Sequence, residues 1–384
     1  MIPYGRQQID ATDIAAVVET LQSDFLTQGP KVPAFEDAVA RRCEAAFAVA
    51  VNSATSALHL ACLALEVGPG DRVWTSPISF VASANCALYC GATIDFVDVD
   101  TRTGLMDVSA LRSKLQQAEA DNTLPKVVIP VHLAGHSCDM QQIHALCSSY
   151  GVRIIEDASH AIGAFYQQRP VGCCAFSDIT VFSFHPVKII TSAEGGMALC
   201  NDLALAGKLR SLRSHGITRD LAEMTEPSHG PWYYQQVALG FNYRMTDLQA
   251  ALGLSQLDRL SQFVEQRIEA TEYYRTLLQD LPIELPAPAV HGVSAWHLYV
   301  IRLQQPAARL HVFEQLRAAS IGVNVHYIPI HTQPYYQKLG FASGQFPNAE
   351  QFYSQIISLP LFAGITAHEQ QQVADALRQA LGSI

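Results

Sequence analysis

The sequence predicts an α/β fold, with a large domain built on a mostly parallel β-sheet and a smaller C-terminal α/β domain. Short runs rich in β-branched and aromatic residues alternate with helical patterns over residues 47–200, which is the rhythm of βαβ units. These runs are apolar on consecutive residues, as expected of parallel strands that helices cover on both faces. The chain has 384 residues, more than the roughly 250–300 that one core usually supports, so two domains are expected.

The expected strands of the large sheet follow one another at 47–51, 72–75, 93–97, 127–131, 153–156, 179–184 and 197–200. Helical patterns continue over 243–261 and 265–279, and the Pro-rich segment 281–288 has the composition of a linker. The second domain is expected to hold strands at 296–303 and 323–327 and helices at 307–319 and 367–381. We therefore expect a large domain with an N-terminal arm over residues 1–260 and a small domain over 261–384.

The composition excludes several classes of protein. Hydrophobic residues make up 49% and charged residues 16% of the chain, which indicates a compact globular protein. The net charge is −10 without a basic run, which argues against binding to nucleic acid or to anionic membranes. Nine scattered cysteines without Cys-x-x-Cys spacing predict neither a disulfide framework nor a metal site. No secretory or membrane-spanning pattern stands out, so the expected location is the cytoplasm.

A carboxylate and a lysine follow two of the expected strands. Asp157 ends the apolar run that begins at Val152, and Lys188 follows the run that contains Ser183. Taken singly, the Asp would be interpreted as a helix cap and the Lys as a surface charge. Lys188, however, lies between apolar neighbours, and a desolvated lysine loses its charge more readily and becomes a usable nucleophile. Ligands of parallel sheets bind at the carboxyl ends of the strands, where both residues are expected.

Segment 51–60 offers a site for an anion. A strand there turns into an Ala-rich helix through Ser53, Thr55 and Ser56, and the N–H groups at a helix N-terminus bind anions. The same residues would also suit an ordinary helix cap. Together with the lysine and the acid, they complete the set that pyridoxal 5′-phosphate (PLP) requires: a lysine for a Schiff base, an acid for the pyridine nitrogen, and donors for the phosphate.

The chain resembles, over nearly its whole length, the PLP-dependent sugar aminotransferases of fold type I known as the DegT/DnrJ/EryC1/StrS family. The motifs that carry the resemblance are LTQGP at 26–30, NSATSA at 52–57, EDASHA at 156–161, SFHPVK at 183–188, EGG at 194–196 and GFNYRMTD at 240–247. The resemblance implies PLP as the cofactor, Lys188 as the Schiff-base lysine and proton carrier, and Asp157 as the partner of the pyridine nitrogen. It also implies a homodimer with shared active sites.

Further roles carry over from the matching motifs. Ala54 and Thr55 match the helix start that holds the cofactor phosphate, and Ser183 matches a phosphate-binding hydroxyl. Asn242 matches a residue that reaches across the dimer interface. Phe80 stands where the family stacks an aromatic ring on the cofactor, although a core position would also suit a Phe.

Two more residues of these motifs have two interpretations each. His160 is expected to orient Asp157 or the cofactor hydroxyl, or to be a satisfied structural histidine. Arg244 is expected to meet the diphosphate of a nucleotide-linked substrate, or to pair with a surface carboxylate.

Segments 2–7, 213–219 and 325–336 resemble the pseudaminic-acid branch of the family. That branch moves the amino group of L-glutamate to C4 of a UDP-linked 4-keto-6-deoxy-N-acetyl-altrose sugar, which are the substrates that the resemblance implies. Tyr4, His326, Tyr327 and His331 are the residues expected in the substrate pocket, and the packing of an aromatic strand would explain the last three equally well. Another UDP-, dTDP- or GDP-linked keto-sugar is the alternative substrate.

Three other classes compete with an aminotransferase. In PLP sugar dehydratases of this fold the family pattern replaces the lysine with histidine, so Lys188 argues against them. A non-catalytic member of the fold would have lost chemical positions that are all filled here. A dinucleotide-binding dehydrogenase would need Gly-x-Gly-x-x-Gly after the first strand, and segment 51–57 lacks it.

Overall fold

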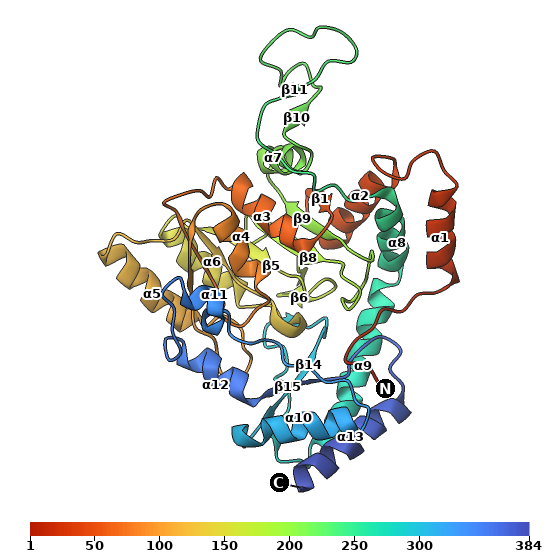
Figure 1. Ribbon diagram of the computed structural model, residues 1–384, viewed down its shortest axis with the longest axis vertical. Helices are drawn as coiled ribbons and strands as arrows, with labels where there is room; N and C mark the ends of the chain where they lie inside the picture. Colours follow the sequence, from red (N-terminus) through yellow and green to blue (C-terminus); the bar gives the residue numbers. More distant parts are fainter. Residues whose placement is uncertain (384) are drawn as a thin grey trace.

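The computed structural model describes residues 1–383 (Figure 1). A central sheet has the strand order β1-β9-β8-β5-β4-β2-β3. Within this sheet only β9 runs antiparallel to its neighbours, so the expected α/β fold with a mostly parallel sheet is confirmed. The strands are β1 (Phe47–Val51), β2 (Arg72–Thr75), β3 (Thr93–Phe96), β4 (Val127–Ile129), β5 (Arg153–Asp157), β8 (Ile179–Ser183) and β9 (Gly196–Cys200).

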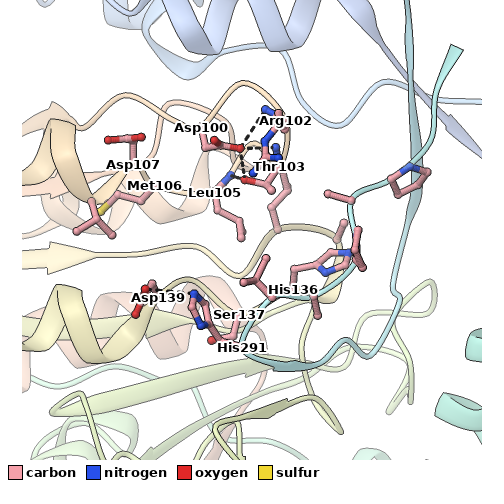
Figure 2. A pocket seen from close by; sticks show the side chains of 18 of the residues that line it. Asp100, Arg102, Thr103, Leu105, Met106, Asp107, His136, Ser137, Asp139 and His291 are labelled. Atoms are coloured by element: carbon pink, nitrogen blue, oxygen red, sulfur yellow. Dashed lines mark hydrogen bonds and ion pairs between the residues drawn. The ribbon is translucent and has the colours of Figure 1, made fainter.

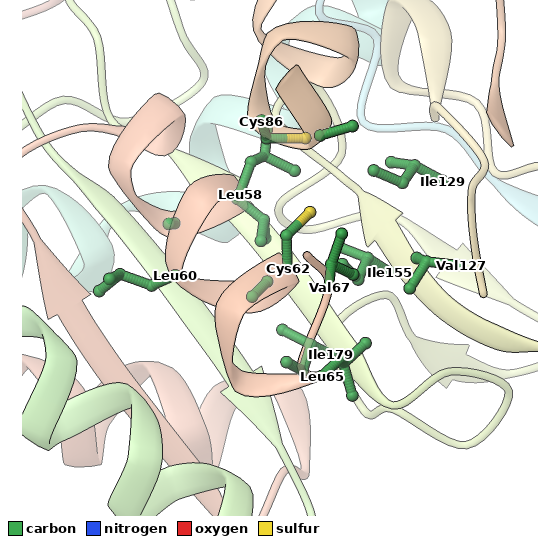
Figure 3. Packing of buried hydrophobic residues seen from close by; sticks show 14 of the residues in the cluster. Leu58, Leu60, Cys62, Leu65, Val67, Cys86, Val127, Ile129, Ile155 and Ile179 are labelled. Atoms are coloured by element: carbon green, nitrogen blue, oxygen red, sulfur yellow. The ribbon is translucent and has the colours of Figure 1, made fainter. Parts of the chain in front are cut away.

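Helices cover both faces of the central sheet. One face packs against α3 (Ala54–Ala64), α4 (Ala82–Tyr89) and α7 (Leu203–Arg213). The other face packs against α2 (Lys31–Cys43), α5 (Val108–Ala120), α6 (Met140–Ser149) and α8 (Asp247–Asp258). The first of these cores is visible in Figure 3, where Leu58 and Cys62 of α3 face Ile129 and Ile155 of the sheet.

Successive side chains of each strand point to opposite faces of the central sheet, so strands that are apolar on consecutive residues make both faces apolar. Val127 and Ile129 of β4 belong to the core beneath α3, whereas Val128 between them belongs to the core beneath α5 and α6. All three are fully buried, and burying each such side chain contributes about 1.5–3 kcal/mol. A strand with this pattern is stable only between two helical layers, as the sequence predicts.

A second sheet is built from the C-terminal part of the chain. It has the order β12-β14-β15, with β12 (Ile283–Glu284), β14 (Tyr299–Leu303) and β15 (Ile356–Leu359). Its core includes residues of α9 (Leu260–Leu278), α10 (Arg309–Ala318) and α13 (Ala367–Gly382). The N-terminal segment joins this core, because Ile2 is buried there and its N–H donates to the Ser320 carbonyl at 2.9 Å.

Some expected elements differ in the structure. The expected strand 323–327 is wrong: only Asn324 bridges to Ser358, and the chain then leaves the sheet so that Tyr327 lines a cavity. The expected linker 281–288 contains strand β12. The helix expected from residue 243 begins at Asp247, because Thr246 forms a capping box with Gln249. Helix α12 (Pro347–Gln355) and strand β15 are not among the expected elements.

The remaining elements lie at the periphery. Helix α1 (Ala11–Leu21) packs against α8, and a hairpin of β10 (Ile217–Thr218) and β11 (Gln235–Gln236) projects from the molecule next to α7 (Figure 1). A small sheet joins β6 (Phe165–Tyr166), β7 (Arg169–Pro170) and β13 (Gly292–Val293). Unlike these elements, short α11 (Pro334–Gln337) buries Tyr336 in the core beneath α3 and α4. Among residues 1–383, no helix has both the length and the apolar character that a membrane span needs.

Candidate active site

A cavity of about 620 Å³ lies where β5 and β8 end. Its walls come from the large sheet, from the starts of α3 and α4, from the N-terminal segment and from segment 324–328. This is the edge of the sheet at which ligands of parallel α/β folds bind. It brings together most of the residues that the sequence suggests: Tyr4, Ala54, Thr55, Phe80, Asp157, His160, Ser183, Lys188, His326 and Tyr327.

Lys188 lies in the turn that follows β8. Its N–H donates to the His185 carbonyl at 2.9 Å, and Ile189 and Ile190 behind it are buried in the core, so its side chain extends into the cavity. Burial lowers the pKa of the Lys188 ammonium to about 8, and the negative charge of Asp157 only partly opposes this shift. A much larger fraction of the amine is therefore uncharged near neutral pH than in an ordinary lysine, as a nucleophile requires.

Asp157 is the last residue of β5 and is almost completely buried. The Ser83 hydroxyl donates to its Oδ2 at 2.5 Å. Ser159 donates to Oδ1 twice, through its hydroxyl at 2.6 Å and its N–H at 3.1 Å. These donors hold the carboxylate in one orientation beside the cavity, where it can receive a protonated group of a ligand.

The start of α3 forms a cradle for an anion. Ser53 caps the helix by accepting from the Ser56 N–H at 3.1 Å, whereas the N–H groups of Ala54 and Thr55 have no acceptor inside the helix. Gly196 of β9 lies against this turn, and a Cβ at that position would stand 2.5 Å from the Ala54 nitrogen. Gly196 also pairs with Ser183 in the sheet. The absence of a side chain at residue 196 therefore lets the sheet approach the helix start.

His160 and Tyr327 form a hydrogen-bonded pair on the cavity wall. Tyr327 Oη lies 3.1 Å from His160 Nε2, and the Ala134 N–H donates to His160 Nδ1 at 3.2 Å. Burial, followed by the nearby charge of Lys188, holds the pKa of His160 well below its usual value. His160 is thus a neutral imidazole.

Phe80 is 59% exposed and lines the cavity, with its ring centroid 6.3 Å from that of Tyr327. This exposure excludes a position in the core. The ring is placed to cover a flat ligand.

Three expected residues do not line this cavity. Asn242 bridges to Ser214, and the Arg244 guanidinium donates to the Ser214 hydroxyl at 3.1 Å, so both lie beside α7. His331 is fully buried, and its Nε2 lies 2.9 Å from a carboxylate oxygen of Glu350. The expectation that His331 lines the substrate pocket is therefore corrected, because its ring packs into the core against Phe346.

Several lining residues have no assigned role in the sequence analysis. They include Ser79, Ser159, His185, Glu194 and Asn324. Glu194 belongs to the EGG motif at 194–196, which is the one signal that could have identified it. Ser83 is also absent from the expected set, because its bond to Asp157 joins residues 74 positions apart.

A second cavity, of about 350 Å³, lies between the starts of α5 and α6 and segment 286–291 (Figure 2). Its carboxylates are already bonded: Asp107 and Asp139 cap the two helices, and Asp100 accepts from the N–H groups of Arg102 and Thr103. Its lining contains no lysine and shares no residue with the first cavity. The first cavity is therefore the candidate active site.

The model of the DegT/DnrJ/EryC1/StrS aminotransferase family matches residues 7–378. The chain belongs to this family. One relative of this aminotransferase is the spore coat polysaccharide biosynthesis protein SpsC of Bacillus subtilis (strain 168). It is 41% identical over 384 residues, which cover 98% of this chain and 96% of that protein.

Solved structures of sugar aminotransferases are similar over the whole chain. Helicobacter pylori PseC, an aminotransferase involved in the biosynthesis of pseudoaminic acid, is 33% identical with a TM-score of 0.91, covering 100% of both chains. Spr1654 of Streptococcus pneumoniae, a proposed sugar aminotransferase in its PLP form, is 30% identical with a TM-score of 0.89, covering 100% of this chain and 99% of that one. This protein is accordingly a sugar aminotransferase that uses PLP.

The residues of the first cavity fit PLP. Three groups line the same cavity: the Lys188 amine with its lowered pKa, the buried Asp157 carboxylate with its fixed orientation, and the start of α3, which a Cβ at residue 196 would obstruct. Such groups would suit, in that order, the aldehyde, the pyridine nitrogen and the phosphate of the cofactor.

Proposed function

We propose that this aminotransferase moves the amino group of L-glutamate to C4 of a UDP-linked 4-keto-6-deoxy-N-acetyl-L-altrose sugar. The observation that carries the proposal is the one cavity in which Lys188, Asp157 and the start of α3 meet. The likeness to PseC over the full length of both chains supports this choice of sugar.

In this proposal Lys188 has two roles. Its amine would hold PLP covalently and, when free, would take up and return the proton at the substrate carbon. A pKa of about 8 suits both, because the amine accepts and returns a proton readily near neutral pH. Asp157 would face the pyridine nitrogen and favour its protonated form. Bound PLP would supply an electron-withdrawing ring that stabilises negative charge at the substrate carbon.

The remaining cofactor contacts follow from the geometry of the cavity. We assign the phosphate to the N–H groups of Ala54 and Thr55 and to the Ser183 hydroxyl, all on the cavity wall. The exposed side chain of Phe80 covers one face of the pyridine ring of the cofactor. His160 forms a hydrogen bond with Tyr327 on the same wall and orients that side chain.

The substrate sugar is proposed to lie against Tyr4, His326 and Tyr327, which form the wall contributed by the N-terminal segment and by segment 324–328. Segment 324–328 belongs to the proposed small domain over residues 261–384, so the site lies between it and the proposed large domain over 1–260. Because nucleotide sugars are cytoplasmic metabolites, the cytoplasm is the proposed location.

We propose a homodimer in which Asn242 and Arg244 serve the cavity of the partner subunit. Both lie outside the lining of their own cavity and contact Ser214, shortly before the projecting hairpin that Figure 1 shows. This region exposes Leu221, Trp232 and Leu239 at 70%, 73% and 82%, and such apolar groups favour a protein interface. Arg244 would then offer its guanidinium to the diphosphate of the nucleotide.

The direct test is transamination with purified protein, PLP, L-glutamate and the UDP-linked 4-keto sugar, followed by mass spectrometry of the sugar and by the release of 2-oxoglutarate. We expect one amino group on the sugar for each 2-oxoglutarate. Parallel reactions with dTDP- and GDP-linked 4-keto sugars, and with aspartate in place of glutamate, measure selectivity. No amine transfer to any of these sugars would contradict the proposal.

A second candidate substrate is another nucleotide-linked keto-sugar. The observation that favours it is the 41% identity to SpsC, which is named for spore coat polysaccharide. A higher kcat/KM for a dTDP- or GDP-linked sugar in the same assay would select this alternative.

A further inference from the structure

The position of the proton on His160 follows from its hydrogen bonds. The Ala134 N–H donates to His160 Nδ1 at 3.2 Å, and a backbone N–H can only donate, so Nδ1 carries no proton. Ala134 is itself held in place, because its carbonyl accepts from the His297 N–H at 2.9 Å. A neutral imidazole has one proton, which must therefore lie on Nε2.

His160 in turn fixes the hydroxyl of Tyr327. Since Nε2 carries the proton, it donates to Tyr327 Oη across the 3.1 Å contact. The Tyr327 hydroxyl oxygen accepts this hydrogen bond, so its own proton points away from His160. Among residues 1–383, Tyr327 Oη has no other hydrogen-bond partner, and its side chain lines the cavity. The Tyr327 proton is thus directed into the cavity.

Several charged or titratable groups surround this pair, and they come from separate segments: Asp157 at the end of β5, Lys188 after β8, His297 before β14, His326 next to Tyr327, and Tyr4 of the N-terminal segment. Burial and the charge of Asp157 raise the pKa of Tyr327, so its hydroxyl stays protonated. Burial and the charge of Lys188 keep His160 and His326 neutral. Tyr327 is therefore a donor throughout the physiological pH range.

We propose that Tyr327, oriented by His160, donates a hydrogen bond to the phenolic oxygen attached to the pyridine ring of bound PLP. It thereby sets the acidity of the proton shared between that oxygen and the Lys188 nitrogen. Tyr327 is then a cofactor contact, and His160 is a positioning residue that acts through it. The inference rests on the proposed binding of PLP at Lys188. It adds a cofactor contact, made by the hydroxyl, to the contact with the sugar that the proposed function gives the Tyr327 side chain.

The expected effect has a definite sign. When the shared proton leaves, negative charge remains on the phenolic oxygen, and a hydrogen bond donated by Tyr327 stabilises that form. Loss of the donor therefore raises the pH at which the proton leaves. A hydrogen bond to a charged group corresponds to a shift of roughly 1–2 pH units.

The test is a pH titration of the visible absorption band of the PLP-loaded holoenzyme. We expect Tyr327→Phe to raise the midpoint by about 1–2 pH units relative to the wild type, and His160→Ala to raise it by a smaller amount, because the hydroxyl stays but loses its orientation. Tyr335→Phe is the matched control, since it removes a tyrosine hydroxyl that lies outside the lining of this cavity, and its midpoint should equal that of the wild type.

The outcomes separate the inference from the proposed function. A wild-type protein without a PLP-dependent band contradicts the proposed function itself. A normal wild-type band with a Tyr327→Phe midpoint that is unchanged or lower overturns the inference. An equal shift in Tyr335→Phe overturns it as well. If Tyr327→Phe does not fold, His160→Ala decides in its place, and a wild-type midpoint there overturns the inference.

Discussion

The Ser83 hydroxyl donates to Asp157 Oδ2 at 2.5 Å, joining the helix that follows Phe80 to the strand that carries the acid. Ser83 is fully buried and Asp157 nearly so, and the bond therefore lies where water cannot replace it. The Ser79 hydroxyl lies 2.7 Å from the Ser83 hydroxyl, so the hydrogen-bond chain that ends at Asp157 continues to Ser79.

Replacing Ser83 with Ala should weaken catalysis without abolishing it. Asp157 would lose one donor and keep both donors from Ser159. A hydrogen bond to a charged group contributes about 1.5–3 kcal/mol, so we predict a fall in kcat of roughly tenfold, at the low end of that range. Ser79→Ala, which leaves every bond to Asp157 in place, is the control. Steady-state kinetics with glutamate check both variants, and a larger loss in Ser79→Ala would contradict this account.

Gly196→Ala should obstruct the phosphate cradle. The new Cβ would stand 2.5 Å from the backbone of Ser53 and Ala54, so the helix start must move, which costs about 1–3 kcal/mol of stability. We predict a lower Tm and a PLP affinity weakened by roughly tenfold or more.

The matched control for Gly196→Ala is Gly207→Ala in α7, where a Cβ meets nothing within 4 Å. Ala is favoured over Gly inside a helix by about 0.5–1 kcal/mol, so this variant should keep its PLP affinity and gain stability. PLP fluorescence and thermal unfolding measure both. Equal PLP affinity in the two variants would contradict the proposal that the start of α3 binds the phosphate of PLP.

The reaction of Lys188 with PLP should follow the protonation of its amine. Lysine is charged below its pKa, and here that pKa is lowered to about 8. The rate of PLP uptake by the apoenzyme should therefore rise about tenfold per pH unit below pH 8 and level off above it. Stopped-flow absorbance measures this profile. A rate that keeps rising to about pH 10 would indicate an ordinary lysine.

Trp232 should contribute to dimer formation. It is 73% exposed in the single chain and lies in segment 219–234, between the two strands of the hairpin. Trp232→Ser should raise the dimer dissociation constant by at least tenfold, because a buried aromatic anchor often contributes 2 kcal/mol or more. Leu310→Ser, 67% exposed on α10, is the control. Sedimentation velocity distinguishes them, and identical behaviour would exclude Trp232 from the interface.

Much of the fold was predictable because local patterns determine it. The strands that end at Asp157 and Ser183 are apolar on consecutive residues, and each lies within about a residue of its expected bounds. Lys188, Asp157 and the start of α3 could be expected in one site because the ends of parallel strands share an edge of the sheet.

Other features depend on contacts that local patterns do not encode. His331 stands in an aromatic run that suits a pocket, yet Glu350 and Phe346 hold it in the core. Segment 323–327 has the composition of a strand, but it pairs with β15 only at Asn324. The bonds from Ser83 to Asp157 and from Ala134 to His160 join distant parts of the chain, and a single sequence carries no periodic signal for such pairs.

The most direct test of the central claim is the visible absorption spectrum of the protein incubated with PLP, recorded before and after addition of L-glutamate, for the wild type and for Lys188→Ala. We predict a band in the wild type that fades with glutamate, and a Lys188→Ala variant that lacks this band and sustains no multiple turnover. A wild-type protein that stays colourless with PLP, or a Lys188→Ala variant that turns over repeatedly, would contradict the account.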